Sequence, residues 1–388
     1  MSKRTFGAIA GLAAAGLLVA ACGGSSGGGS SSSAAPAPDS SSAAPAPESS
    51  SAEPAPTTAK VGVILPDAAS SARWETADRP FLEQAFNAAG VEYDIQNANG
   101  DKAKFATIAD QMLNSGVQVL MLVNLDSPSA AAVIKKANDQ GVPTIDYDRL
   151  TLAGNANYYV SFDNVAVGTK IGEGLVTCMQ ANGNSSGPVA LLNGSPTDNN
   201  ATLFKEGYET VLKGAGYTIA ADQSVPDWDN TKAGTIFEQM YTEVGGDLIG
   251  VAAANDGLGG AAIAVLERNG VAGQVPVTGQ DATDEGLQRV LLGTQCMTVY
   301  KAVKAEADAA AQLAIDLIQA NIPAADALAN KTVTDTETGA EVKSVLLVPV
   351  AIFPENVKDV IADGFTTYDR VCTTPAIQEK CAEYGINP

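Results

Sequence analysis

The sequence predicts an α/β protein with two parallel sheets, each covered by helices on both faces. From residue 60 onward, short apolar segments alternate with amphipathic helical stretches, a pattern typical of parallel strands joined by crossover helices. Three extended segments interrupt this alternation. We therefore predict two doubly wound lobes joined by a three-segment hinge.

The first predicted lobe opens with strands and helices in strict alternation. Its helices stop at or near Gly90, Gly116 and Gly141, and glycine commonly ends a helix. The strands are placed at 61–65, 93–96, 117–123 and 142–146, and the helices at 77–89, 102–114 and 128–139.

The second predicted lobe repeats the alternation from residue 165 onward. Its helices are placed at 165–181, 199–213, 230–244, 257–268 and 283–291, and its strands at 188–192, 217–221, 247–253 and 275–279. The hinge segments are placed at 158–162, 294–300 and 344–352, with an Ala-rich helix at 301–320. The lobes then comprise 59–161 plus 300–345, and 162–299 plus 346–388.

The N-terminus has the pattern of an export signal. Lys3 and Arg4 precede an apolar run at 6–20 that is short for a membrane span. The run ends in Val-Ala-Ala-Cys, which resembles a bacterial lipobox, so we expect residues 1–22 to be a lipoprotein signal with Cys22 lipidated. The alternative is an ordinary secretory signal with an incidental cysteine. Residues 23–58 are nearly all Gly, Ser, Ala and Pro, which predicts a disordered tether.

Four cysteines follow the tether, and an even number in an exported protein suggests disulfides. Four cysteines allow three pairings. We favour Cys372 with Cys381, because they are close together in a terminal tail, and Cys178 with Cys296 would follow. Buried free thiols are the alternative.

Composition excludes several classes of function. The chain has 44 acidic and 23 basic residues, a net charge of −21 and no histidine. This charge argues against nucleic acid or an anionic membrane surface as a partner. The absence of histidine removes the commonest zinc ligand and the usual general base. No cofactor or metal is expected, and no GxSxG, HExxH or phosphate-loop sequence points to an enzyme.

Polar side chains follow the predicted strands in both lobes. In open parallel sheets, ligands bind where the carboxyl ends of the strands meet. Both tryptophans and a set of acidic, amide and basic residues occur there: Arg73, Trp74, Asp148, Arg149, Asp198, Asn199, Trp228, Asn255 and Asp281. Carboxylates, amides and guanidinium groups can satisfy sugar hydroxyls, and an indole packs on the C–H face of a pyranose.

Each of these residues also has a simpler interpretation. Asp and Asn after a strand often only cap the next helix, which would suffice for Asp256, Asn199 and Asp229. The arginines could be surface charges, and the tryptophans could be packing residues. The binding hypothesis depends on the whole set recurring in both lobes, which independent caps would not require.

The same loops resemble the xylose-binding branch of the ribose/galactose-type sugar-binding family, whose members have the type I periplasmic binding protein fold and serve ATP-driven importers. The shared stretches occur in family order at 73–74, 96–100, 146–149, 159–164, 194–201, 254–256, 278–282 and 297–301. Two regions depart from the family pattern: the loop 66–72 lacks basic residues, and the tail after Gly364 lies outside it.

The resemblance implies a monosaccharide ligand, D-xylose first, with glucose or another aldose as the alternative. It implies hydrogen bonds from Arg73, Arg149, Asn199, Asn255, Asp281 and Lys301, stacking by Trp74 and Trp228, and assistance from Asp148 and Asp198. It also implies a monomer that delivers sugar to importer permease subunits from the outer face of the membrane.

Three other functions are weighed against this one. A secreted carbohydrate-active enzyme would need two poised carboxylates, whereas these loops also carry cations and amides. A ligand-sensing repressor would need a basic DNA-binding segment where the lipobox and tether stand. A receptor feeding a sensor instead of an importer stays open.

Overall fold

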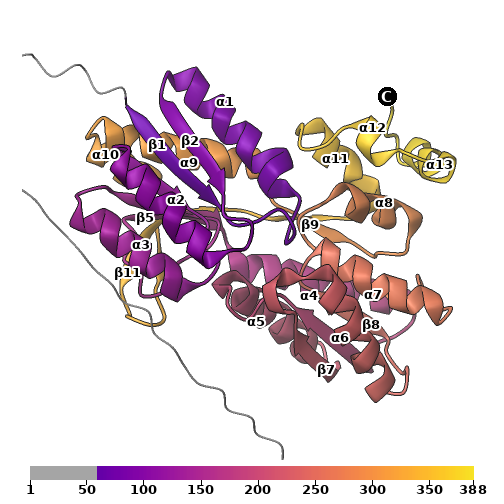
Figure 1. Ribbon diagram of the computed structural model, residues 1–388. Coiled ribbons are helices and arrows are strands. Elements are labelled where there is room, and N and C mark those ends of the chain that lie inside the picture. Colours follow the sequence, from indigo (N-terminus) through magenta and orange to yellow (C-terminus); the bar gives the residue numbers. More distant parts are fainter. Residues whose placement is uncertain (1–58) are drawn as a thin grey trace, which may run out of the picture. The chain divides into compact units, whose positions relative to one another are not determined.

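A computed structural model describes residues 59–388; the predicted signal peptide, Cys22 and the tether lie outside this range. The described chain forms two parallel sheets with helices packed on both faces (Figure 1). No helix between residues 59 and 388 is long and apolar enough to cross a membrane.

The first lobe is built on a seven-stranded sheet in the order β10-β11-β5-β4-β3-β1-β2. Its strands are β1 (Lys60–Leu65), β2 (Glu92–Asn97), β3 (Val119–Leu122), β4 (Thr144–Tyr147), β5 (Tyr158–Phe162), β10 (Lys331–Thr334) and β11 (Glu341–Leu347). All neighbours pair in parallel except the hairpin of β10 with β11. The central strands are fully buried and rich in Val, Ile and Leu, as expected for a sheet covered on both faces.

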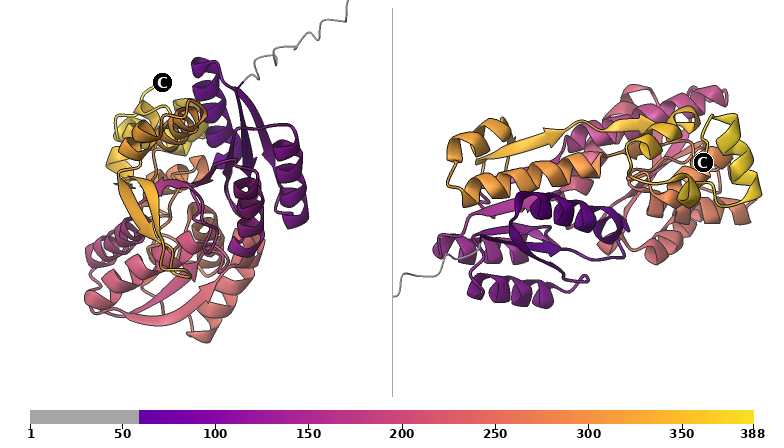
Figure 2. Two further views of the ribbon diagram at one scale, coloured as in Figure 1. Left: turned by 90° about the vertical axis from the view of Figure 1, so that its left-hand side faces the viewer. Right: turned by 90° about the horizontal axis from the view of Figure 1, so that it is seen from above.

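Helices form a layer on each face of this sheet. One layer holds α1 (Arg79–Ala89) and α9 (Val303–Ile318), with α10 (Ile322–Leu328) beside α9 (Figure 2); the other holds α2 (Lys102–Asn114) and α3 (Ser127–Asp139). The apolar faces of these helices and the strand side chains form two separate cores, one on each side of the sheet.

The second lobe has the sheet order β7-β6-β8, from β6 (Pro188–Asn193), β7 (Thr218–Ser224) and β8 (Gly250–Ala253). Isolated parallel bridges Val251–Val277 and Thr278–Met297 continue it outward. Its helices are α4 (Asn164–Ala181), α5 (Asn199–Gly214), α6 (Asn230–Glu243), α7 (Asp256–Arg268) and α8 (Asp284–Leu292). In both lobes the first strand thus lies between the second strand and the third.

Helices α4 and α5 pack unusually closely because glycines face their contact. A Cβ atom on Gly168 would lie 2.0 Å from the carbonyl oxygen of Phe204, and one on Gly207 would lie 2.5 Å from the backbone nitrogen of Thr169. These distances are far below van der Waals contact, so neither position accepts a side chain. The close packing fixes the start of α5, which carries pocket residues.

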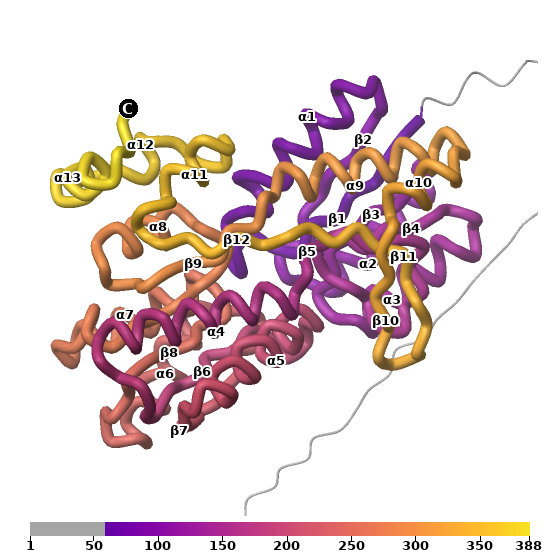
Figure 3. The backbone as a smooth tube through the Cα atoms, turned by 180° about the vertical axis from the view of Figure 1, so that it is seen from behind, coloured from indigo at the N-terminus to yellow at the C-terminus, as the bar shows by residue number. Residues whose placement is uncertain are grey.

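The chain passes between the lobes three times, from β5 to α4, from β9 (Thr298–Tyr300) to α9, and from β11 to β12 (Val350–Ile352) (Figure 3). Strands β9 and β12 pair antiparallel, so two of the crossings are bonded to each other. The 2-1-3-4-5 order of doubly wound sheets and these three crossings match the predicted architecture.

Some predicted elements differ in the structure. The stretch 344–352 is two strands rather than one; β11 ends at Leu347, and Pro349, which has no N–H, follows before β12. Segment 275–279 makes only isolated bridges, with Pro276 inside it. Helix 77–89 begins earlier, as a wide turn at Trp74–Asp78 before α1. The hairpin of β10 and the helices of the tail were not predicted.

The tail packs on the second lobe through a small core of its own. Helices α11 (Val357–Ala362), α12 (Tyr368–Val371) and α13 (Pro375–Glu383) contribute to a cluster with α8 and Tyr300. The structure joins Cys372 to Cys381 inside this cluster and joins Cys178, near the end of α4, to Cys296, just before β9.

Candidate functional site

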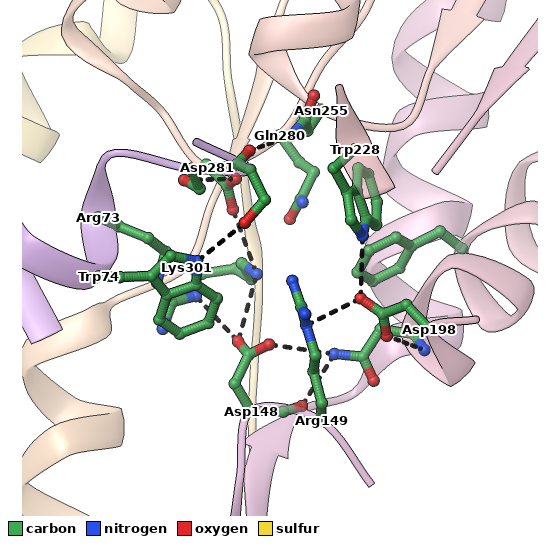
Figure 4. A pocket seen from close by; sticks show the side chains of 14 residues that line it. Arg73, Trp74, Asp148, Arg149, Asp198, Trp228, Asn255, Gln280, Asp281 and Lys301 are labelled. Carbon is green, nitrogen blue, oxygen red and sulfur yellow. Dashed lines mark hydrogen bonds and ion pairs between the residues drawn. The ribbon is translucent and has the colours of Figure 1, made fainter. Parts of the chain in front are cut away.

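A pocket lies between the two lobes, where the carboxyl ends of both sheets face each other (Figure 4). Nine of the ten predicted ligand-binding residues line it: Arg73, Trp74, Asp148, Arg149, Asp198, Trp228, Asn255, Asp281 and Lys301. The loops after β1 and β4 supply the first lobe's residues, and the loops after β6, β7, β8 and segment 275–279 supply the second lobe's.

The tenth predicted residue, Asn199, is replaced by its neighbour. Asn199 is the half-buried first residue of α5 and does not line the pocket, whereas Asn200 is 2% exposed and does. Successive residues of a helix point about 100° apart, so a shift of one position turns the side chain from the pocket to its flank. Asn200 Nδ2 donates to the carbonyl oxygen (2.8 Å) and to Oδ1 (3.2 Å) of Asp148.

Four further residues of the lining were not on the predicted list: Ser70, Ser71, Phe204 and Gln280. Phe204 lies four residues after Asn200 on α5, so helical periodicity could have found it once Asn200 was known. Gln280 directly follows segment 275–279, and its position at a strand end was a usable signal. The two serines belong to an irregular loop, which carries no periodic signal.

Arg73 anchors a buried ionic network in the first lobe. It pairs with Asp78 at 2.7 Å, Asp148 at 2.9 Å and Glu306 at 2.6 Å. Its Nε also donates to Asp78. Of the five guanidinium N–H groups, four are used in these contacts, so Arg73 has one left for a ligand. These contacts hold Asp148 in place beside the pocket.

The ionisation of this network follows from its burial. Burial raises the pKa of Glu306 well above its ordinary value, and Asp148 and Asp78 nearby raise it further, against the opposing effect of Arg73. Burial therefore opposes the ionisation of Glu306, and Arg73 favours it. Burial also disfavours ionised Asp148, but Lys301, Arg73 and Arg149 outweigh it and lower the pKa of that carboxyl.

Arg149 extends from the first lobe to the second. Its Nε pairs with Asp198 Oδ2 at 2.9 Å, and its Nη1 donates to the carbonyl oxygen of Asn124 at 3.1 Å. Three guanidinium N–H groups stay free of protein partners among the described residues. Arg149 can therefore offer three N–H donors to a ligand.

Lys301 lies at the second hinge crossing, between β9 and α9. Its Nζ is 3.2 Å from Asp281 Oδ1 of the second lobe and 3.6 Å from Asp148 Oδ2 of the first. Burial disfavours the ammonium, but Asp148 and Asp281 outweigh it and raise the pKa of Lys301. The lysine is charged and bridges both lobes at the hinge.

Two residues that line the pocket also cap helices, so capping a helix does not keep a side chain out of the pocket. Asp198 accepts the Asn200 N–H through Oδ1 at 2.9 Å, while its Oδ2 contacts Arg149 and Trp228 of the pocket lining. Asn255 accepts the Leu258 N–H through Oδ1 at 2.9 Å, and its Nδ2 points to the carbonyl oxygen of Ser70. By contrast, Asp229 caps α6 and is absent from this lining.

The two indoles line the pocket from opposite lobes. Trp74 donates through Nε1 to Ser70 at 3.2 Å, and its ring centre is 4.6 Å from the guanidinium carbon of Arg73. Trp228 donates to Asp198 Oδ2 at 3.1 Å. Trp228 and Asp227 both have left-handed backbone angles, φ 56° and 60°, an uncommon conformation for such side chains.

The lobes are in contact across the pocket. Besides the ion pairs, Ser71 Oγ donates to Asp281 at 3.3 Å, and Tyr159 OH bonds to Asn200 at 3.3 Å. The cavity left between these groups is about 20 Å³, roughly the space that one water molecule needs. A larger ligand would have to separate the lobes and exchange some of these contacts for its own.

This lining suits recognition rather than proton transfer. Both oxygens of Asp198 are occupied by N–H donors, and both oxygens of Asp148 contact donors as well. Neither carboxyl is free to serve as an acid or base. The groups instead present fixed donors and acceptors on all sides of a small volume.

Two lobes, three crossings and a pocket at the facing strand ends define the type I periplasmic binding protein fold. A family model described as a periplasmic binding protein domain matches residues 61–322, and the chain belongs to this family. It is similar to D-xylose-binding periplasmic proteins of Escherichia coli (34% identical, covering 79% of this chain and 90% of that protein) and Haemophilus influenzae (32%, 80% and 92%).

Among solved structures, one similar fold is an ABC transporter solute-binding protein from Clostridium phytofermentans with bound β-D-glucose. It superposes with a TM-score of 0.72 at 25% identity, covering 80% of this chain and 99% of that one.

Proposed function

We propose that this protein is an extracytoplasmic receptor that captures a monosaccharide between its lobes and delivers it to an ABC importer. The single observation that carries this proposal is the interlobe pocket, in which Arg149, Asp198, Asn200, Asn255 and Asp281 surround a small polar volume. A pyranose has hydroxyls that donate and accept at once, and such a set of fixed groups matches it.

The two tryptophans support a ring-shaped ligand. A pyranose has apolar C–H faces that pack on an indole. Trp74 and Trp228 approach the pocket from different lobes, so a sugar contacts both only when the lobes are closed. A ligand that makes more contacts in the closed state stabilises that state, which is the physical basis of capture by closure.

D-xylose is the proposed ligand, and glucose is the alternative. The names of the two sequence relatives favour xylose, while the Clostridium protein was solved with glucose. The loop 66–72, which lacks basic residues, lies beside the pocket through Ser70 and Ser71. This departure from the family pattern is the reason for keeping glucose as the alternative.

The remaining parts of the proposal concern location and partners. Lipidation at Cys22 would hold a monomeric receptor at the outer face of the membrane, next to the permease that accepts the sugar. A secreted carbohydrate-active enzyme is disfavoured because the carboxylates of Asp148 and Asp198 are occupied by donors. A receptor that reports to a sensor rather than an importer would have the same pocket.

Calorimetric titration of residues 59–388 tests the proposal, since this fragment contains the hydrophobic cores of both lobes. Xylose, glucose, ribose, arabinose and galactose would each be titrated. One sugar bound at about micromolar affinity or tighter, with no product formed, is the expected result. No heat from any of these sugars would contradict a monosaccharide receptor.

A further inference from the structure

Gln280 has a buried acceptor that the protein does not satisfy. The residue is 3% exposed and lines the pocket, and its Oε1 has no hydrogen-bond partner among residues 59–388. Figure 4 shows its side chain extending between Asn255 and Asp281 into the pocket. A buried acceptor without a donor destabilises a fold, so its presence at a pocket indicates a partner that arrives with the ligand.

Only three other buried side-chain atoms in the described chain lack a partner, and each belongs to a group that is otherwise engaged. Asn164 donates through Nδ2 to Asn200, Glu306 contacts Arg73 through its second oxygen, and Asp281 Oδ1 faces Lys301 at 3.2 Å. Gln280 has no such bond through Oε1. It is therefore the clearest open acceptor of the pocket.

The backbone directly after Gln280 is held in an uncommon conformation. Asp281 and Ala282 have φ values of 93° and 50°, in the left-handed region. The carbonyl oxygen of Gln280 accepts the Asp256 N–H at 3.0 Å, and Asp256 Oδ2 accepts the Thr283 N–H at 2.9 Å. Strain of this kind persists where surrounding bonds enforce it, most often at ligand sites.

The pocket is polarised along its length. Arg149 supplies three unused N–H groups at one end. Gln280 Oε1 and Asp281 Oδ1 are acceptors at the other end. A ligand that fits must accept hydrogen bonds near Arg149 and donate one near Gln280. A hydroxyl can do both, whereas a ligand carboxylate placed against Gln280 Oε1 would bring two acceptors together without a proton between them.

We infer that Gln280 accepts a hydrogen bond from one ligand hydroxyl and makes the pocket selective for ligands that carry a hydroxyl at that position. This inference rests on the proposed function, because it concerns how the same pocket recognises a neutral sugar. A ligand that lacks the hydroxyl leaves Gln280 Oε1 unpaired inside the closed pocket. Sites of this kind reject such analogues strongly.

The test uses two buried glutamines with opposite bonding. Gln280→Leu removes the unsatisfied acceptor. Gln295→Leu is the matched control, because Gln295 donates to Asp256 at 2.7 Å and accepts from Arg289 at 3.0 Å. We expect Gln280→Leu to keep or raise the Tm of the sugar-free protein, since it removes an unpaired buried group, and Gln295→Leu to lower it. If the Gln280 side chain instead stabilised the sugar-free fold, Gln280→Leu would lower the Tm.

Affinities for the bound sugar and its monodeoxy analogues complete the test. One deoxy analogue should bind the unsubstituted protein about 100-fold more weakly than the parent sugar. Gln280→Leu should bind the parent sugar at least about tenfold more weakly than the unsubstituted protein does. The variant should bind the deoxy analogue no more than about threefold more weakly than it binds the parent sugar. If Gln280→Leu binds the parent sugar unchanged, the inference is wrong and the receptor function stands. If no sugar binds the unsubstituted protein, the receptor function fails, and the inference with it.

Discussion

Arg149 of the first lobe and Asp198 of the second meet across the pocket, with 2.9 Å between Arg149 Nε and Asp198 Oδ2. Their side chains are 8% and 5% exposed, so the pair is almost completely removed from water. Asp148, the residue before Arg149, contacts Asn200, two residues after Asp198. The same two loops are thus joined by an ion pair and by a hydrogen bond.

Replacing Arg149 should therefore affect both binding and folding. In Arg149→Met the sugar loses three donors and Asp198 loses its countercharge. We expect affinity to fall at least about 100-fold, and the free energy of unfolding to fall by about 3 kcal/mol. Titration calorimetry and urea unfolding would measure the two effects.

A second substitution separates these effects. Arg149→Met combined with Asp198→Asn leaves no buried charge at this position, and asparagine can still cap α5. Stability should recover in the double variant while binding stays lost. Unchanged sugar affinity in Arg149→Met would contradict the assigned role of Arg149.

Gly194 determines where Trp228 can lie. A Cβ atom at position 194 would be 2.1 Å from a ring carbon of Trp228, so Gly194→Ala must displace the indole. We expect at least about tenfold weaker sugar binding, because the stacking surface moves. Quenching of tryptophan fluorescence by the sugar should change as well.

Gly234→Ala is the matched control, since a Cβ atom there meets nothing within 4 Å. Gly234 is inside α6, where alanine should stabilise the helix by about 0.5–1 kcal/mol. Its affinity for sugar should stay unchanged. Equal affinities in both variants would show that Trp228 is not placed by Gly194.

Stability should depend on pH through Asp146, which lies beneath the loop carrying Asp148 and Arg149. Burial raises the pKa of Asp146 from 3.8 to about 7, despite hydrogen bonds from Thr151 and with a smaller contribution from Asp335. The folded state thus binds a proton that the unfolded state releases near pH 4. The stabilisation is complete below about pH 4 and is lost as pH rises to about 7.

Asp146→Asn removes this proton while leaving a side chain that can bond to Thr151. The free energy of unfolding of the unsubstituted protein should fall by up to about 4 kcal/mol more than that of the variant between pH 4 and pH 7. Urea unfolding at several pH values would measure the difference. Parallel curves for the two proteins would show that Asp146 is ionised throughout.

Cys22→Ser tests the lipid anchor. If Cys22 is lipidated, the substitution should move the protein from the membrane fraction to the soluble extracytoplasmic fraction, because two or more acyl chains are needed for stable anchoring. Cell fractionation and metabolic labelling with a fatty acid would show this. Membrane retention of the serine variant without label would contradict lipidation.

The sequence was most informative where a polar residue directly followed a buried strand. Arg149, Asp198, Asn255 and Asp281 were predicted on that basis, and the topology brings them into one pocket because the carboxyl ends of both sheets face each other. Asn200 was missed by one position. Polar residues after a strand indicate which loop lies at the site, but not which way each side chain points at the start of the following helix.

Other features had no local signal in the chain. Arg73 reaches Glu306, 233 positions later, and only the hinge topology brings the two together. The wide turn at Trp74–Asp78, which brings Asp78 to Arg73, does not show in hydrophobic periodicity. The tail helices are short, and they are held in place by a disulfide and by a small core shared with α8.

Asp198 and Asn255 both line the pocket and cap a helix, and this combination limits how the receptor can be redesigned. Each holds the first turn of a helix with one side-chain oxygen, so changing either to alter ligand preference also weakens the scaffold. The Gln280 side chain carries no such obligation among the described contacts, because its Oε1 has no hydrogen-bond partner. A library aimed at a biosensor for another sugar should therefore diversify Gln280 and keep the two capping residues constant.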